Sequence, residues 1–190
     1  METVVTNGRS SSSIAQNDKT VRKTNIHNVD DFPGEDRTFG GHYLYVDLIP
    51  KTTWFKNARS HMSVDDWKKV RTKVYNRAND MCEICGKRAP EKIEAHERWS
   101  YDDATNVQKL ERLIALCKMC HTTTHFGLAE IRGLGDVAFR HLMIVNGWTP
   151  QQANDHIDEA FRIWRYRSSK QYRLDLTILE RTGVKIFKSR

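Results

Sequence analysis

Hydrophobic and polar positions alternate with helical spacing in three stretches of the chain. The first follows Ser63 and begins with acidic residues, as the first turn of a helix often does. Another covers residues 134 to 146, and a third begins at Thr149-Pro150, a capping residue followed by proline at the first helical position. The apolar positions of the first and third stretches are Trp67, Val70, Val74, Tyr75 and Ala78, then Ala153, Ile157, Ala160, Phe161 and Trp164. These patterns predict three helices.

Shorter stretches predict extended structure between the helices. Residues 43 to 49 form an apolar run that ends at Pro50 and suits a strand or an extended cover. Residues 92 to 99 alternate between apolar and polar side chains, carry His96 and lead into a turn at residues 100 to 103. Helices and short strands together predict an α+β fold.

Composition divides the chain into four segments. Residues 1–41 are rich in Ser, Asn, Asp and Gly, which predicts a flexible N-terminal arm that could dock a host or regulatory protein. Residues 42–80 contain the extended segment and the leading helix, and residues 81–130 contain all the cysteines. Residues 131–190 contain the C-terminal helices and a basic segment.

The cysteines form two CxxC pairs. They are Cys82, Cys85, Cys117 and Cys120. Two residues between thiolates allow one tight turn to offer both sulfurs to one ion, so a doubled pair predicts a closed structural zinc site. Disulfides or a redox pair are the alternative. Against it, the start of the chain lacks the pattern of a secretory leader, and Gly86 and Lys87 follow the first turn as in a zinc knuckle.

The spacing of the pairs indicates that something is built between them. Cys85 and Cys117 are separated by 31 residues, whereas a simple zinc ribbon has about 15 to 20. The insert contains the strand predicted to carry His96. After the second pair, His121 and His125 are four residues apart, so they share one face if the segment is helical.

This arrangement resembles the HNH nuclease superfamily, in the zinc-containing branch where two CxxC pairs frame the core. The resemblance covers residues 81 to about 127, roughly a quarter of the chain, and residues 113 to 121 are its most specific part. It implies a small ββα-metal core framed by the four-cysteine zinc site, with flanking helices. The flanks look like those of bacterial and phage proteins of this type.

Position by position, the resemblance assigns His96 as the general base, and His121 and His125 as ligands of a catalytic ion. Phosphodiester hydrolysis needs a water to be deprotonated and the developing charge to be neutralised, which an imidazole and a cation can supply. Two imidazoles favour Zn, Ni, Co or Mn over Mg. The implied cofactors are therefore structural zinc and a second divalent ion, one of Mg, Mn, Ni, Co or Zn.

Two positions depart from the family pattern. The family usually has a metal-binding Asp or His immediately before the base, where this chain has Ala95. The family's loop Asn corresponds to Arg112. Glu97, on the other side of the base, is the candidate replacement ligand. An active enzyme and an inactive descendant both remain open on these residues.

The C-terminal segment carries the basic surplus of a chain whose net charge is +7. Residues 161 to 190 hold nine basic and two acidic side chains, whereas residues 1 to 40 hold five and six. Alternation over residues 172 to 178 predicts a terminal strand, with a helix over residues 176 to 179 as the alternative. Basic residues interleaved with aromatics favour nucleic-acid binding, although a solvated face is equally compatible. The candidate contacts are Arg162, Arg165, Arg167 and Lys170.

The sequence therefore predicts an HNH-type endonuclease that hydrolyses DNA in the cytoplasm of a bacterial cell, possibly phage-encoded. No apolar run approaches the length of a membrane span, so no membrane association is expected. The first alternative is a nuclease-inactive zinc protein that binds nucleic acid or a host protein. The second is a structural zinc adaptor whose arm recruits another protein. Substrate preference and oligomeric state are left open.

Overall fold

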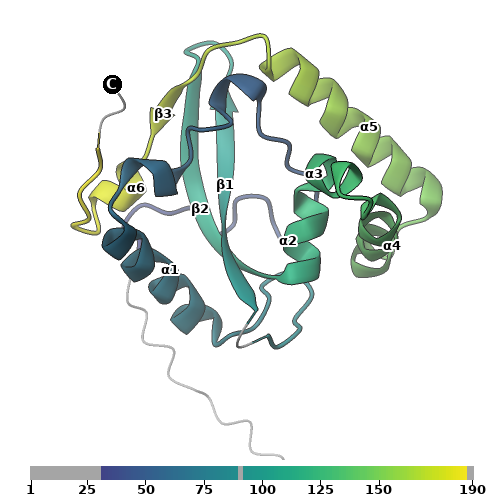
Figure 1. Cartoon of the computed structure of the whole chain (residues 1–190), viewed down its shortest axis with the longest axis horizontal. Helices are drawn as coiled ribbons and strands as arrows, with labels where there is room; N and C mark the ends of the chain where they lie inside the picture. The colour runs from purple at the N-terminus through teal and green to yellow at the C-terminus, as the bar shows by residue number, and fades with distance from the viewer. Residues whose placement is uncertain (1–30, 90–91, 188–190) are drawn as a thin grey trace, which may run out of the picture.

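A computed structural model describes residues 31–89 and 92–187 of the chain. A three-stranded sheet in the order β1-β2-β3 lies at its centre (Figure 1). Strands β1 (Ile93–Asp102) and β2 (Val107–Cys117) form a long antiparallel hairpin, and the short β3 (Arg173–Asp175) pairs in parallel with β2. The mixed α+β class predicted from the sequence is confirmed.

The helices lie on both sides of this hairpin. Helices α1 and α6 are on one side, and α2 to α5 are on the other (Figure 1). Their bounds are α1 Val64–Ala78, α2 Lys118–Thr124, α3 Phe126–Ile131, α4 Gly135–Asn146, α5 Pro150–Arg167 and α6 Thr177–Glu180. Two short 3-10 helices, η1 (Lys51–Thr53) and η2 (Ala58–His61), precede α1. The apolar run Leu113 to Leu116 is fully buried because helices cover both faces of β2.

The three predicted helices are confirmed, together with their start signals. The Ser63 side chain accepts a hydrogen bond from the backbone N–H of Asp66 at 3.1 Å, which caps α1. Thr149 and Gln152 form a reciprocal capping box at the start of α5, with Pro150 in the first turn. At the C-terminus, both predicted alternatives occur in sequence, since β3 is followed directly by α6.

Residues 43 to 49 are extended but belong to no strand. The backbone of Leu44 exchanges two hydrogen bonds with the Asn146 side chain, and the Val46 N–H donates to Nε2 of His156 at 2.9 Å. The Asp47 N–H donates to the Thr124 carbonyl oxygen at 2.9 Å. The segment is therefore the extended cover, fixed against α2, α4 and α5.

The described part of the predicted N-terminal arm is packed onto the core. Phe32 is fully buried, and the Glu35 carboxylate pairs with Arg77 at 2.5 Å and accepts from the Leu113 N–H at 2.7 Å. Residues 31 to 41 are therefore part of the folded unit, because a buried aromatic ring and a buried ion pair hold them. The rest of the predicted arm, residues 1–30, lies outside the described residues.

Candidate metal centre

A small ββα-like element carries two clusters of potential metal ligands. It consists of β1, β2 and α2, which follow one another along the chain. Four cysteines gather at one end of the hairpin, and three histidines gather between β1 and α2. Both clusters use residues of α2, so one short helix positions ligands in two sites.

The four cysteine sulfurs lie within 4.8 Å of one another. Gly86, in the left-handed conformation at φ 70°, ends the first turn, and its N–H donates to the Cys82 carbonyl at 2.9 Å. The second pair straddles the junction of β2 and α2. The Cys85 and Cys117 sulfurs are 3.7 Å apart, close to the separation of about 3.8 Å that tetrahedral Zn–S bonds produce. The residues fit a closed four-thiolate zinc site.

The ionisation of these closely spaced thiols favours a bound cation. A hydrogen bond from Cys120 lowers the pKa of Cys82, and the same bond together with burial raises the pKa of Cys120. Further thiolates in this space would repel one another unless a cation neutralised them. None of the four cysteines is in a disulfide. The arrangement can hold a zinc ion.

The histidine cluster joins β1 to α2. His96 lies on β1, His121 lies on α2, and His125 is the C-terminal capping residue of α2. The Nε2 atoms of His121 and His125 are 3.2 Å apart, and one ring nitrogen from each histidine lies within 4.8 Å of the others. Metal–nitrogen bonds of about 2.1 Å place two ligands of one ion about 3.0 to 3.4 Å apart. The helix pair therefore has the spacing of two ligands on one cation.

Burial keeps the three imidazoles neutral. It lowers the pKa of His121 to about 4 and that of His125 to about 4. The pKa of His96 is well below its ordinary value, mainly because of burial and also because of the two other histidines. The ring centroids are 4.7 to 5.3 Å apart. Protonated rings so close would repel, whereas neutral rings present lone pairs that a metal ion or an acidic proton can use.

Glu94 is a carboxylate at the cluster that the sequence reasoning missed. It contacts Nδ1 of His121, which fixes the outer nitrogen of that ring and leaves Nε2 facing His125. Strand alternation was the available signal, because residues two apart on a strand lie on one face and Glu94 precedes His96 by two.

Asp47 is the second missed carboxylate, and it comes from outside the ββα-like element. Its Oδ2 lies 3.9 Å from Nε2 of His96, and its side chain is only 12% exposed. Nε2 of His96 has no hydrogen-bond partner among the described residues. The gap exceeds a direct hydrogen bond. Asp47 is the only charged residue in the apolar run 43 to 49, and that exception was the available signal.

The structure does not bring Glu97 to the histidines. Its Oε1 accepts a hydrogen bond from the Ala58 N–H at 2.8 Å, and it is not part of the histidine cluster. Burial raises its pKa to about 7, opposed by hydrogen bonds from the Ala58 and Arg59 backbones. Glu97 lines the same cavity as His96, but its carboxylate is held at the Ala58 backbone and not at the histidines. The carboxylate nearest to the His96 ring is therefore Asp47.

The two residues that depart from the family pattern have structural positions. Ala95 faces Ala115 in the register of the hairpin. Arg112 is buried, and its guanidinium pairs with Glu83 of the first CxxC turn at 3.1 Å. The other oxygen of Glu83 accepts from the Ala115 N–H at 2.7 Å. Arg112 thus anchors the first cysteine turn to β2.

Three of the four predicted nucleic-acid contacts are engaged within the protein. Arg162 pairs with Glu159 at 2.6 Å, the Arg167 guanidinium lies 4.2 Å from the centroid of the Tyr101 ring, and Lys170 donates to the Asp103 carbonyl at 3.0 Å. Arg165 is exposed on α5. These residues are not among those that line the cavity next to the histidines.

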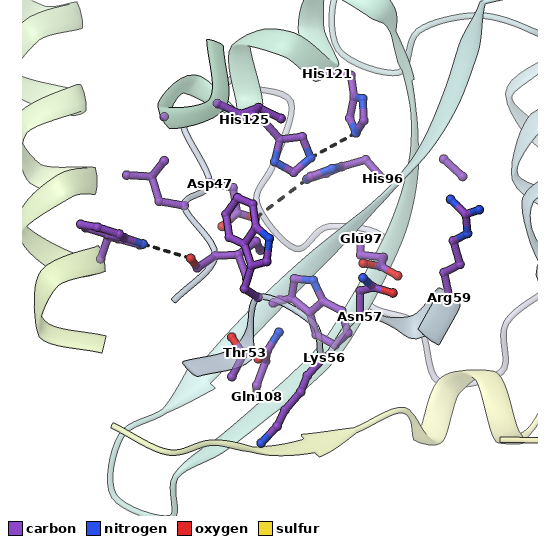
Figure 2. Close-up of a pocket in the computed structure, with 18 of the residues that line it drawn as sticks. Asp47, Thr53, Lys56, Asn57, Arg59, His96, Glu97, Gln108, His121 and His125 are labelled. Atoms are coloured by element: carbon purple, nitrogen blue, oxygen red, sulfur yellow. Dashed lines mark hydrogen bonds and ion pairs between the residues drawn. The ribbon is translucent and has the colours of Figure 1, made fainter. Parts of the chain in front are cut away.

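That cavity has a volume of about 800 Å³. The three histidines and Asp47 lie at one end of it, and Gln108, Thr53 and Lys56 lie at the other (Figure 2). The site is therefore accessible to a molecule larger than water, whereas the cysteine cluster is not part of the cavity lining.

Comparison of the chain with protein-family models, curated proteins and solved structures finds no match. Among the described residues, no helix is long and apolar enough to span a membrane.

Proposed function

We propose that this protein is a divalent-metal-dependent endonuclease of the HNH type that cleaves DNA phosphodiesters, with the four cysteines holding a structural zinc ion. The observation that carries the proposal is the joint position of His96, His121 and His125 on a ββα-like element next to the cysteine cluster. A single buried histidine is commonly structural, whereas three neutral imidazoles together at one end of a cavity supply the groups that the proposed reaction needs.

The residues divide into three roles. His121 and His125 would hold the second ion, and Glu94 orients the His121 ring through its outer nitrogen. A divalent ion bound there would supply Lewis acidity and neutralise charge on the phosphate. His96 takes the proton from the attacking water, because its ring is neutral and its Nε2 has no protein hydrogen-bond partner in the described part of the chain.

Asp47 is the positioning residue for His96. A carboxylate 3.9 Å from the ring nitrogen stabilises, by its negative charge, the imidazolium that forms on proton transfer. The contacts of residues 44, 46 and 47 with α2, α4 and α5 hold this carboxylate near the ring. In this proposal, Asp47 supplies the carboxylate near His96, because position 95 is an alanine and the Glu97 carboxylate is bound at Ala58.

Cleavage of plasmid DNA by the purified protein tests the proposal, with Mg, Mn, Ni, Co and Zn each supplied in turn and with a chelator control. We expect cleavage that depends on the added ion. His96→Ala should lower the rate about a hundredfold or more, since positioned proton transfer contributes roughly 10² to 10⁴. A matched control is His61→Ala, because His61 is also a buried histidine but is not among the residues of the cluster. Folded wild-type protein that cleaves neither plasmid DNA nor single-stranded DNA or RNA with any of these ions would contradict the proposal.

The second candidate function is a nuclease-inactive zinc protein that binds nucleic acid or a host protein. Arg112 favours it, because the position of the family's loop Asn is occupied by a side chain committed to Glu83. In that case the cysteine cluster would still take up zinc, and His96→Ala would leave nucleic-acid affinity unchanged while no variant showed cleavage.

A further inference from the structure

The cavity beside the histidines has the size and walls of a ligand site. Its volume of about 800 Å³ lies in the usual range for small-molecule pockets. Aromatic rings from four separate segments form much of the lining, namely Trp54, Trp67, Trp99, Phe161 and Trp164. Aromatic side chains around a cavity suit a ligand that is itself aromatic.

Gln108 indicates which hydrogen-bonding groups the ligand should offer. Its side chain lines the cavity at the end away from the histidines (Figure 2), and it is only 1% exposed. Both its amide nitrogen and its amide oxygen are buried, and neither has a hydrogen-bond partner among the described residues. An unpaired buried amide destabilises a protein, so its presence in the wall of a cavity points to a ligand that offers one acceptor and one donor side by side.

We infer that this cavity accepts an unpaired nucleobase of a nucleic-acid strand, an inference that rests on the proposed nuclease function for the path of that strand. The edge of a nucleobase presents a donor next to an acceptor, the pattern with which a Gln amide forms two hydrogen bonds. Its faces stack on aromatic side chains. A base that is paired and stacked in a duplex cannot enter, so the substrate is single-stranded nucleic acid or a strand with an extruded base.

The segment of residues 51 to 62, which supplies part of the cavity lining, suits the nucleic-acid strand that carries such a base. Residues 51 to 62 contain Lys51, Lys56 and Arg59 and no acidic residue. Trp54 is 53% exposed there, and Phe55 next to it is 84% exposed. Positive charge interleaved with exposed aromatic rings is the combination that binds single strands, by phosphate contacts and by stacking.

The distance along the β1–β2 hairpin agrees with a nucleic-acid strand that runs from the Gln108 end of the cavity to the histidines. Gln108 faces Tyr101 in the β1–β2 register, five residues beyond His96. At about 3.3 Å per strand residue, the two ends of the site are about 16 Å apart. That length exceeds the rise of about 3.4 Å between stacked nucleotides several-fold. The base at Gln108 and the phosphate at His96 therefore belong to different nucleotides of one strand.

The test is fluorescence anisotropy with labelled 12-nucleotide oligonucleotides and no added divalent ion, so that binding is measured without cleavage. The ligands are single-stranded DNA, single-stranded RNA of the same sequence, the DNA duplex, and DNA strands in which successive nucleotides are abasic. The variants are Gln108→Leu and Trp54→Ala. Tyr43→Ala is the matched control, because Tyr43 is 64% exposed and does not line the cavity.

We expect single strands to bind more tightly than the duplex, and one abasic position to weaken binding about tenfold. Trp54→Ala should weaken single-strand binding by a similar factor, and Gln108→Leu several-fold, while Tyr43→Ala has no effect. Gln108→Leu should also raise the melting temperature of the free protein by a few degrees, because it removes an unpaired buried amide. A raised melting temperature would show that weaker binding by Gln108→Leu does not come from loss of folding. The comparison of the DNA and RNA oligonucleotides shows which kind of single strand the protein prefers.

Equal affinity of wild type, Gln108→Leu and Trp54→Ala for single strands would overturn the inference, as would abasic strands that bind as tightly as intact ones. Failure of the proposed nuclease function gives a different result. In that case no ion supports cleavage, yet single-strand binding remains sensitive to Gln108 and Trp54, and the base-binding cavity stands alone.

Discussion

The cysteine cluster and the histidine cluster share one ββα-like element but differ in how they are assembled. The cysteine cluster takes two ligands from the turn that follows α1 and two from the junction of β2 and α2, and its sulfurs form a closed set. The histidine cluster combines His96 of β1 with the pair His121 and His125 at α2, and it lies at the end of a cavity. A closed set of four donors suits a structural ion, whereas two histidine ligands beside open space leave coordination positions for substrate and water.

The comparison also shows how each cluster depends on the rest of the chain. Residues of the hairpin itself support the cysteines, through the contact of Arg112 with Glu83. The histidines depend on a distant segment, because Asp47 reaches His96 only through the extended cover. We therefore expect changes at the first cluster to affect folding and changes at the second to affect activity.

The largest expected effect is on the cysteine side of the comparison. Cys117→Ser should lose the zinc ion and unfold the region, because a structural zinc site contributes folding free energy on the order of 10 kcal/mol in small zinc domains. Metal analysis and thermal melting measure both quantities. His125→Ala, next to the same helix, should retain one zinc ion and melt near the wild-type temperature. A Cys117→Ser protein with unchanged zinc content and melting temperature would contradict a structural zinc ion at the cysteine cluster.

The next effect concerns the ion at the histidines. His121→Ala and His125→Ala should each raise the midpoint for activation by the added ion about tenfold or more, because each removes a ligand. His96→Ala should leave that midpoint nearly unchanged, since its role is proton transfer. Calorimetric titration of each variant with Mn or Ni gives the affinities. Equal affinities in all three variants would show that the helix pair does not bind the ion.

Asp47→Asn sharpens the comparison by separating function from folding. The rate of cleavage should fall about 10- to 100-fold while the metal midpoint stays constant, as expected for a residue that supports a site residue without binding the ion. Burial raises the pKa of Asp47 to about 6, above its ordinary 3.8, so ionised Asp47 opposes folding at neutral pH. The variant should therefore be at least as stable as wild type at pH 7. A large loss of melting temperature together with activity would instead assign Asp47 a structural role.

The smallest effect is the pH dependence of the extended cover. Burial lowers the pKa of His156 from its ordinary 6.5, and its neutral Nε2 accepts the Val46 N–H. The folded state then binds this proton less readily than the unfolded state, so this stabilisation is complete above pH 6.5 and is lost as the pH falls below it. His156→Gln keeps an acceptor that does not titrate, and it should lose less stability than wild type between pH 7.5 and pH 5, by about 1 kcal/mol. Parallel melting curves for the two proteins across this range would exclude the contribution.

Local patterns determined much of the fold. Ser63 and Thr149 mark the starts of α1 and α5 because a helix N-terminus needs a side-chain acceptor for its free N–H groups. The spacing of the cysteines indicated their cluster, because two residues between thiolates fix a turn. The i, i+4 spacing likewise predicted that His121 and His125 share a helix face, and their Nε2 atoms lie 3.2 Å apart. Each of these inferences concerns residues close together in the chain.

Tertiary packing decided the remaining features of the site. Asp47 precedes His96 by 49 positions in the sequence, and only the packing of the cover against α2, α4 and α5 brings them together. Glu97 was predicted as a ligand from its adjacency to His96, yet its carboxylate is held at the Ala58 backbone and not at the histidines. Gln108 gave no signal in the sequence, because an unpaired amide is recognised only when the surrounding elements have buried it. Sequence determines short-range geometry through turns and helical periodicity, whereas contacts between distant segments depend on the burial of the whole core.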